Sequence, residues 1–252
     1  MSKTINTLLI GESWMIQTTE TKGFDTFTVS SYGEGTEFIR PVLSGEGFTF
    51  THMPCHRISE DFPRRAEDLA QFDVIIISDV GANTFLLPIE TFLQCKTSPN
   101  KLEMLKNYVL QGGGLCMAGG YLSFMGIEGK GKYRDSLLEE ILPVRFQPGD
   151  DRMEHPEGLD VAIDPGSHPI LHGLPPAIHG ILGYNKAEAK PEGRVIARIQ
   201  GDPFLTLGEF GKGRSIAFAT DVAPHWASQD FCQSEAYRTL WQNMARWLAK
   251  AI

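Results

Sequence analysis

The sequence has no long hydrophobic run and no excess of positive charge. Its apolar runs fall well short of the roughly 20 residues that a membrane-spanning helix requires, so we expect no membrane partner. Lysine and arginine together number 23 against 31 aspartates and glutamates, which gives a net charge of −8. Without a basic field to attract a phosphate backbone, we also expect no nucleic-acid partner.

Cysteine is scarce, and the cysteines are not paired. None lies in a C-x-x-C motif, a usage typical of free thiols in a reducing compartment. Residues 1–10 carry one lysine and an apolar run that Glu12 soon interrupts, too short for the core of a signal peptide. We therefore expect a cytoplasmic protein. The cysteines are Cys55, Cys95, Cys116 and Cys232.

Motifs for nucleotides and metals are missing as well. There is no G-x-x-x-x-G-K-[S/T] loop, and the glycines at 112–114 precede a strand where a dinucleotide fingerprint would follow one. No H-E-x-x-H or EF-hand pattern occurs, so we expect no cofactor. His52, Cys55 and His56 could place metal-ligand atoms beyond a predicted strand. Pro54 could equally turn the chain there, so both interpretations stay open and no metal is predicted.

Short apolar runs alternate with amphipathic stretches in the first half of the chain. Residues 7–10, 48–53 and 72–78 have the length and composition of strands. The third run contains a continuous β-branched segment, which is typical of a central parallel strand covered on both faces. We therefore expect helices on both sides of this sheet.

Two segments of the first half have helical spacing. Apolar side chains recur at helical intervals over 36–43 and 102–109. Gly112 is placed to end the second helix at its C-cap, before a strand at 115–118. This alternation predicts a doubly wound, mostly parallel α/β sheet whose ligand site lies beyond the carboxyl ends of the strands.

The second half has a different pattern. Residues 148–158 are polar and rich in turn formers, and short strands predicted at 159–163 and 195–199 favour an antiparallel arrangement. Residues 204–208 and 214–219 flank a five-residue loop that contains glycine, which predicts a β-hairpin. The chain then closes with a helix whose apolar stripe is expected to cover the sheet.

The most distinctive segment is 112–124, which has the sequence Gly-Gly-Gly-Leu-Cys-Met-Ala-Gly-Gly-Tyr-Leu-Ser-Phe. It resembles the nucleophile elbow of class I glutamine amidotransferase-like proteins. Three further segments, Gly-Glu-Ser-Trp-Met at 11–15, Lys-Gly-Phe-Asp at 22–25 and Asp-Val-Ala-Pro-His-Trp at 221–226, make the chain similar to the bacterial family of "putative glutamine amidotransferases", related to ThuA-like proteins. The resemblance covers nearly the whole chain, and residues 1–252 are expected to form a single domain. It implies a flavodoxin-like α/β fold of the class I amidotransferase type, with a C-terminal β-hairpin and a closing helix.

Active enzymes of that superfamily carry a cysteine within G-x-C-x-G at a strained strand-to-helix turn, where backbone N–H groups stabilise an oxyanion. Gly114 and Cys116 match the first half of this pattern, but Ala118 replaces its second glycine. A turn at Gly119 and Gly120 would leave Cys116 inside the preceding strand. Cys116 therefore has two interpretations: a buried structural thiol, which we favour, and a catalytic nucleophile.

The histidine partner also has two candidates. His155-Pro-Glu157 matches the His-x-Glu pair of the amidotransferase triad, but it precedes the last strands instead of following them, so we favour coincidence. Asp221 and His225 follow the last predicted strand and are the better positional counterpart. We expect them to be catalytic acid–base or binding groups; the alternative is that His225 only caps or packs beside Trp226.

Polar groups at two other strand ends complete the expected site. Carboxylates, an amide, a lysine and a tryptophan at one crevice suit a small polar ligand such as a sugar or an amino acid. The Gly-Gly-Tyr backbone at 119–121 is expected to hold an anion. The alternative for the Asp and Asn residues is turn or cap chemistry. The expected ligand-binding residues are Glu12, Trp14, Lys22, Asp25, Asp79, Asn83, Gly119, Gly120 and Tyr121.

Three functions follow from these interpretations. The first is an amidotransferase-like protein without a convincing elbow cysteine that binds or hydrolyses a small polar metabolite. The second is a non-catalytic oligomeric scaffold of the same fold. The third, and least favoured, is a true cysteine-dependent glutaminase, which requires Cys116 to reach the elbow. A homo-oligomer is compatible with the superfamily, and the sequence does not fix its symmetry.

Overall fold

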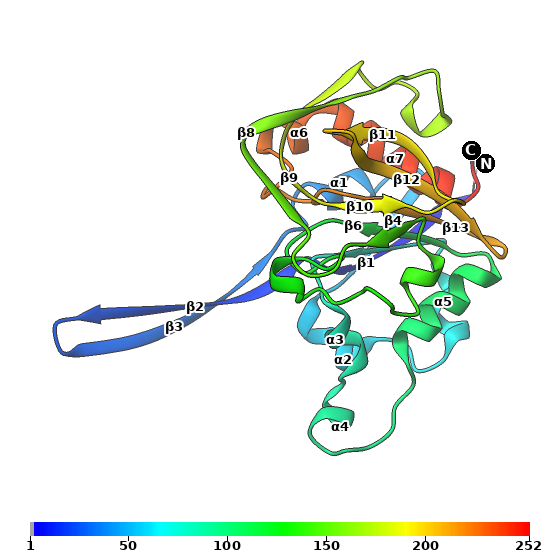
Figure 1. Cartoon of the computed structure of the whole chain (residues 1–252). Coiled ribbons are helices and arrows are strands. Elements are labelled where there is room, and N and C mark those ends of the chain that lie inside the picture. Colours follow the sequence, from blue (N-terminus) through cyan, green and yellow to red (C-terminus); the bar gives the residue numbers. More distant parts are fainter. Residues whose placement is uncertain (1–2) are drawn as a thin grey trace.

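A computed structural model describes residues 3–252 of the chain (Figure 1). Within these residues the main sheet has nine strands in the order β4-β1-β5-β6-β13-β12-β11-β8-β9. Its first five strands run parallel, in the 2-1-3-4-5 order of a flavodoxin-like sheet. They confirm the strands predicted at 7–10, 48–53, 72–78 and 115–118. The five are β4 (Phe48–Met53), β1 (Ile5–Gly11), β5 (Val74–Ser78), β6 (Gly114–Ala118) and β13 (Gly213–Phe218).

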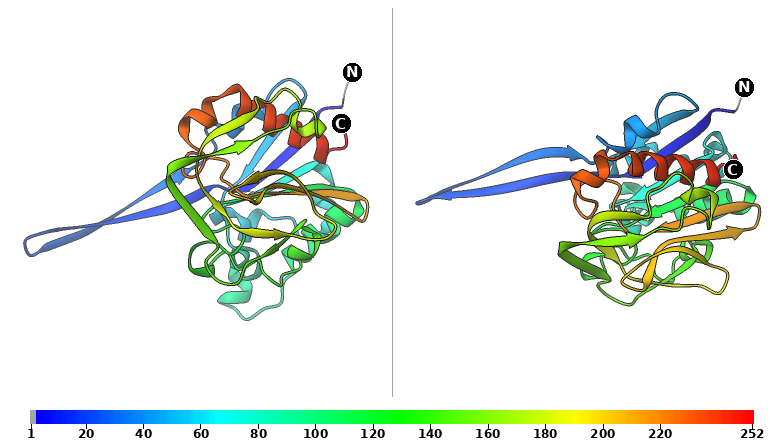
Figure 2. Two further views of the ribbon diagram at one scale, coloured as in Figure 1. Left: turned by 45° about the horizontal axis from the view of Figure 1, so that its top comes forward. Right: turned by 90° about the horizontal axis from the view of Figure 1, so that it is seen from above.

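Side chains of the parallel strands alternate between two hydrophobic cores, one on each face of the sheet. Leu8 and Ile10 of β1 pack into the core that contains Leu105, whereas Leu9 packs into the core that contains Trp241. The period-two alternation of a strand buried on both faces produces this division. Figure 2 shows the last helix lying along one face. That face is covered by α1 (Ile39–Val42) and α7 (Glu235–Leu248), the other by α2 (Ile58–Asp61), α3 (Ala82–Leu86) and α5 (Lys101–Gln111).

The two predicted helices differ in outcome. Helix α5 is confirmed, and Gly112 ends it at φ 128°, a left-handed value that glycine adopts without strain. Asn100 caps its start by accepting the N–H groups of Leu102 and Glu103. Helix α1 is a single turn, shorter than the predicted 36–43, because Gly45 and Gly47, both at positive φ, lead the chain directly into β4.

Four antiparallel strands extend the sheet beyond β13, so the parallel order is confined to the first five. The segment 148–158 is not a loop throughout, because β8 begins at Arg152 and its polar residues pair with β9. Phe210 pairs with Gly213, which leaves a turn of only Gly211 and Lys212 where a five-residue loop was predicted. These strands are β12 (Asp202–Phe210), β11 (Arg194–Ile199), β8 (Arg152–Ala162) and β9 (Ala177–Asn185).

A long hairpin that the sequence analysis did not predict projects from the body of the protein (Figures 1 and 2). Strands β2 (Ser13–Lys22) and β3 (Asp25–Glu34) pair over their full lengths and form a sheet of their own. We call residues 13–34 the arm. Its strands are rich in threonine and serine, and their longest apolar run is only the three residues at 14–16, which explains why the pattern was missed.

The remaining elements are short. Strands β7 (Val144–Phe146) and β10 (Ala187–Ala189) form a second two-stranded sheet, and α4 (Ile89–Phe92) and α6 (Gln229–Gln233) are single turns. Within residues 3–252, every helix is too short or too polar to cross a membrane.

Candidate functional site

Three carboxylates converge where three parallel strands end. Glu12 follows β1, Asp79 follows β5 and Asp221 lies shortly after β13, and the carboxyl ends of parallel strands share one edge of a sheet. Glu12 and Asp79 have φ values of +46° and +45°, which non-glycine residues rarely adopt and which cluster at functional sites. The Glu12 N–H donates to the Ser78 carbonyl at 3.0 Å, so the two strand ends are tied together.

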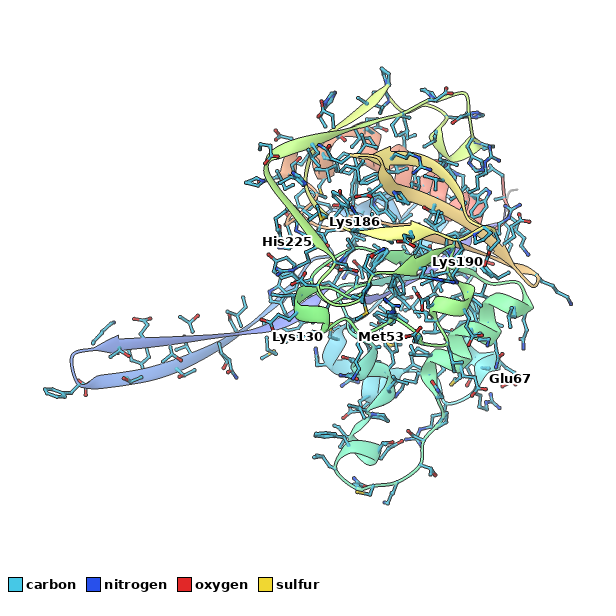
Figure 3. All side chains as sticks on the ribbon, viewed as in Figure 1. Met53, Glu67, Lys130, Lys186, Lys190 and His225 are labelled. Atoms are coloured by element: carbon cyan, nitrogen blue, oxygen red, sulfur yellow. The ribbon has the colours of Figure 1, made fainter. Side chains whose placement is uncertain are left out.

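Asp221 and His225 form a hydrogen-bonded pair at this edge. The His225 Nδ1 lies 2.7 Å from Asp221 Oδ2, which also accepts the Trp226 N–H at 3.2 Å. This bond orients the imidazole and leaves Nε2 to face a ligand. The Asp221 side chain is buried, whereas that of His225 is 45% exposed, and Figure 3 shows His225 at the end of the molecule from which the arm leaves.

Burial governs the protonation of the cluster. It raises the pKa of Glu12 well above its ordinary value, and the carboxylates of Asp79 and Asp221 raise it further. Burial also raises the pKa of Asp79, and it raises that of Asp221 to about 6. The hydrogen bond to Asp221 raises the pKa of His225. Burial and mutual repulsion therefore both favour a proton held within the cluster, a feature that acid–base chemistry uses.

These groups line a pocket of about 250 Å³ with one aromatic wall. The Tyr121 ring meets the His225 ring edge-on, with the ring centroids 4.4 Å apart. The Arg152 guanidinium lies over Tyr121, 4.7 Å from the ring centroid. The lining residues are Glu12, Trp14, Asp79, Tyr121, Asp221, Ala223, Pro224 and His225.

The turn after β6 has no room for a nucleophile. A Cβ at Gly119 would lie 2.3 Å from the Ala219 carbonyl oxygen, and a Cβ at Gly120 would lie 2.8 Å from Asp221 Oδ1. Gly120 also has φ +143°, where any side chain is strained. No side chain fits at either elbow position, so a cysteine there is excluded by sterics as well as by the sequence.

The turn after β6 binds a carboxylate of the protein itself, that of Asp79, which corrects the expectation of a free anion-binding turn. Asp79 Oδ1 accepts the Leu122 N–H at 2.7 Å. The Gly120 N–H donates to Asn185 Oδ1 at 2.9 Å, and the Gly119 N–H donates to the carbonyls of Phe218 and Thr220. The N–H groups of Gly119, Gly120 and Leu122, which could stabilise a substrate oxyanion, are therefore already occupied.

Sequence reasoning missed Asn185 and Asp151, which support this turn from the antiparallel half of the sheet. The Asn185 amide donates to Gly120 O and to Asp151 Oδ1 at 3.3 and 2.8 Å. Asp151 in turn accepts the N–H groups of Met125 and Gly126. Asn185 ends β9, at the opposite edge of the main sheet from β4, so no local spacing relates it to the glycines that it holds.

Cys116 lies inside β6 with its side chain fully buried, facing the core beneath α7. Burial raises its pKa well above the ordinary thiol value. The structure therefore does not bring Cys116 to the pocket. It lies in the middle of β6 on the face that packs into the core beneath α7, and a thiol in an apolar core is neither ionised nor accessible.

Alkylation of the native protein with iodoacetamide is expected to modify Cys95 first, because Cys95 is exposed and Cys55 is partly buried. Cys116 and Cys232 are buried, and burial raises the pKa of Cys232 to about 12. Both should react only after denaturation, since the thiolate is the reactive form. Mass spectrometry of tryptic peptides measures the order. Rapid labelling of native Cys116, slowed by glutamine, would contradict its placement in the core.

Three other expected ligand-binding residues also lie away from the pocket. Lys22 and Asp25 are cross-strand neighbours at the tip of the arm, because β2 and β3 continue the chain away from the sheet edge. Asn83 is exposed in the first turn of α3. The expectation that these three residues face the site is therefore wrong.

The alternative histidine motifs have structural partners of their own. His155 is hydrogen-bonded to Glu157 at 2.9 Å on β8, outside the pocket. The His52 Nε2 bonds to the Gly11 carbonyl at 2.8 Å, and the Cys55 N–H donates to Ser13 Oγ. Within residues 3–252, no three His, Cys, Asp or Glu side chains are arranged to hold a metal ion.

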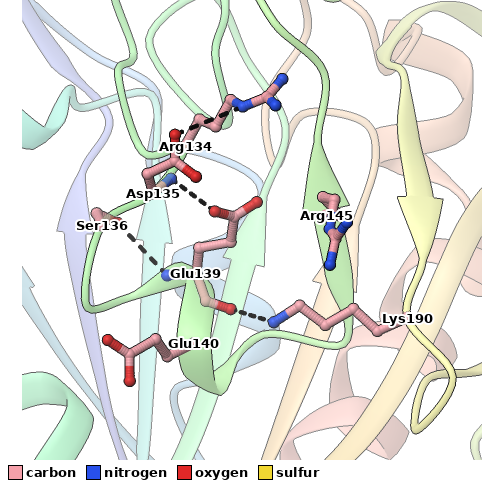
Figure 4. A pocket seen from close by; sticks show the side chains of 7 residues that line it. All are labelled: Arg134, Asp135, Ser136, Glu139, Glu140, Arg145 and Lys190. Atoms are coloured by element: carbon pink, nitrogen blue, oxygen red, sulfur yellow. Dashed lines mark hydrogen bonds and ion pairs between the residues drawn. The ribbon is translucent and has the colours of Figure 1, made fainter.

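A larger cavity of about 490 Å³ opens elsewhere on the surface (Figure 4). Its lining combines three cationic and three acidic side chains. Glu139 accepts the N–H groups of Asp135 and Phe146, and the Lys190 ammonium donates to the Glu139 carbonyl. These hydrogen bonds link Glu139 to β7 and to Lys190, which follows β10. The cavity is lined by Arg134, Asp135, Ser136, Glu139, Glu140, Arg145 and Lys190.

Comparison with known proteins agrees with this architecture. Residues 6–250 match the model of a family described as "Putative glutamine amidotransferase". The cytoplasmic proteins STM3548 and STM1381 from Salmonella typhimurium are 44% and 43% identical, each with a TM-score of 0.92. Their matches cover 96% and 97% of this chain and 98% and 99% of theirs. A ThuA-like protein from Parabacteroides merdae shares the fold at 11% identity and a TM-score of 0.56, over 99% of this chain and 91% of its own. No protein of curated function matches.

Proposed function

We propose, from the premise that this chain belongs to the "putative glutamine amidotransferase" family, that its pocket binds a small polar metabolite and acts on it without a thiol. The observation that carries this proposal is the convergence of Glu12, Asp79 and Asp221 on the exposed His225 in one pocket of about 250 Å³. That volume suits a ligand of the size of a monosaccharide or an amino acid.

A glutaminase mechanism has no support in this site. Thiol-dependent amide hydrolysis needs a reactive cysteine at the elbow and free N–H groups for the tetrahedral oxyanion. Gly119 and Gly120 occupy the elbow, Cys116 is buried in the core, and Asp79 occupies the amide of Leu122. The family resemblance therefore extends to the fold and to the position of the site, while the chemistry rests on carboxylates.

The polar groups of the pocket favour a ligand that donates hydrogen bonds. Ionised carboxylates only accept hydrogen bonds, so Asp79 and Asp221 suit hydroxyl or ammonium groups. The ring faces of Trp14 and Tyr121 suit the apolar face of a sugar or the carbon skeleton of an amino acid. In a hydrolytic reaction His225 Nε2 would accept or return the proton of a water molecule, with Asp221 holding the imidazole in place.

A thermal-shift screen with glutamine, monosaccharides and disaccharides tests the proposal. A ligand at 100 times its dissociation constant stabilises the folded state by about 2.7 kcal/mol, which raises the Tm of a chain of this size by about 5–10 °C. His225→Gln is expected to remove most of that Tm shift and to lower the rate of any turnover at least about 100-fold. His155→Gln, the matched control, removes a histidine that is hydrogen-bonded to a carboxylate outside the pocket and should leave both unchanged.

The alternative function is a non-catalytic oligomeric scaffold, favoured by the absence of an elbow nucleophile and by the projecting arm. This alternative predicts that no ligand class shifts the Tm. It also predicts that His225→Gln and wild type give the same result in the thermal-shift screen. Cytoplasmic location is part of both proposals, because the two Salmonella relatives are described as cytoplasmic proteins. Both proposals also include a single domain, since the family match spans residues 6–250.

A further inference from the structure

We propose that the arm joins two copies of this chain, with its apolar face packed on an exposed apolar patch next to α4 of the second copy. A two-stranded hairpin is marginally stable at best in water, and needs a further strand or a packing surface. The arm makes neither contact within its own chain over most of its length, and Figures 1 and 2 show it projecting from the body in every view.

The strand register gives the arm two different faces: Met15 and Tyr32 lie near the base of one face, which beyond them carries threonine, serine and glutamine, and the other face carries apolar side chains further out. Cross-strand partners share a face, and successive residues alternate between faces. Ile16, Val29 and Phe27 therefore lie on one face, each about half exposed at 45%, 51% and 43%. Thr19 and Thr28 lie on the other face, where their hydroxyls are hydrogen-bonded at 3.0 Å. An amphipathic sheet with both faces in solvent lacks the cover that its apolar face requires.

A second surface of the same chain is apolar and uncovered. The connection around α4 exposes five large hydrophobic side chains, with Phe92 and Leu93 exposed at 67% and 69%. Such clusters on a soluble protein mark interaction sites. We call this surface the α4 patch; it consists of Leu86, Leu87, Ile89, Phe92 and Leu93.

Charge also matches the two surfaces. The outer half of the arm carries Glu20 and Asp25 against one lysine, Lys22. The surroundings of the α4 patch carry the exposed Arg64 and Lys96 against Glu90. Opposite charges at the rims of two apolar surfaces favour their association over that of like surfaces.

The area of such an exchange is sufficient for a specific dimer. Ten-residue strands are about 33 Å long and their hairpin is about 10 Å wide, so one face of the arm covers roughly 300 Å². Two arms on two patches then bury roughly 1,200 Å² in total, the lower end of the range for specific interfaces. Reciprocal exchange closes a two-fold dimer, in which each chain contributes an arm and a patch.

Light scattering coupled to size exclusion tests this assignment with matched variants. Wild type is expected at twice the chain mass of 27.9 kDa. Phe27→Lys with Val29→Lys should raise the dimer dissociation constant at least about 30-fold. Thr26→Lys with Thr28→Lys adds the same charge to the opposite face of the same strand and should leave the dimer intact. Monomeric wild type, or equal effects of the two pairs, would overturn the proposal.

A mixing experiment identifies the surface that receives the arm. Phe92→Lys with Leu93→Lys should also give monomers. An equimolar mixture of this patch variant with the arm variant should associate more strongly than either variant alone, because one intact arm can then reach one intact patch with half of the wild-type contact area. A patch variant that stays dimeric, or a mixture that associates no more strongly than the separate variants, would rule out the α4 patch as the arm's partner. Both surfaces lie outside the two cores, so unchanged circular dichroism serves as the folding control.

Discussion

Gly119→Ala is expected to lower the Tm by at least about 6 °C, a large stability effect for a single methyl group. The new Cβ would lie 2.3 Å from the Ala219 carbonyl oxygen and 2.9 Å from Asn185 Oδ1. The Gly119 N–H is bonded to two carbonyls, at 2.8 and 3.0 Å, so neither backbone can move away without losing hydrogen bonds. Such overpacking costs about 3 kcal/mol or more, and each kcal/mol corresponds to about 2–4 °C for a chain of this size.

Gly166→Ala is the control for this substitution. Its Cβ would have one neighbour, Asp164 Oδ1 at 3.5 Å, and its φ is not in the left-handed region. Its Tm should stay within about 2 °C of wild type, as for ordinary surface substitutions. Equal thermal unfolding curves for the two variants would mean that the turn after β6 is looser than the structure shows.

Glu12→Gln is expected to stabilise the protein at neutral pH and to abolish ligand binding. Burial raises the pKa of Glu12 well above that of an exposed glutamate. As pH rises, the unfolded chain releases this proton first, so stability falls between the unfolded and folded pKa values and stays low above them. Glutamine has the same size, can keep a hydrogen bond to Ser78 and carries no charge, which removes this cost.

The expected gain depends on pH. Near pH 4 Glu12 is protonated in the folded protein and largely protonated in the unfolded chain, so the two proteins should melt together. Above the folded pKa, each pKa unit of the shift is worth about 1.4 kcal/mol, so a rise in Tm of about 3 °C or more is expected at pH 8. Glu46→Gln, at an exposed position before β4, is the control. A Glu12→Gln variant that is less stable than wild type at pH 8 would mean that the carboxylate stabilises the fold.

A stability gain combined with loss of binding is the signature of a functional residue. Residues kept for function are often held at the expense of stability. Asp221 fits the same description, because its Oδ1 is buried without a hydrogen-bond partner among the described residues. A buried carboxylate that lacks one partner is costly for folding alone, and a ligand that donates to this cluster would offset that cost.

The sequence by itself was sufficient for the features that depend on local order along the chain. Apolar runs and their spacing predicted the parallel strands and α5, and the order of strand ends placed Glu12, Asp79 and Asp221 at one edge. Because Asp221 and His225 are four residues apart in the loop that follows β13, their pairing was within reach of local geometry. The family followed from four short segments.

Only the tertiary structure decided which groups satisfy one another across the sheet. Asp79 occupies the amide of Leu122, and Asn185 holds Gly120 from the far end of β9. The threonine-rich arm, which carries Lys22 and Asp25 away from the site, has only a three-residue apolar run and gave a weak strand signal in the sequence. The physical reason is that periodicity records which face of its own element a residue occupies. Hydrogen-bond partners and steric room at the turn after β6 depend on residues that are 40 to 100 positions away in sequence.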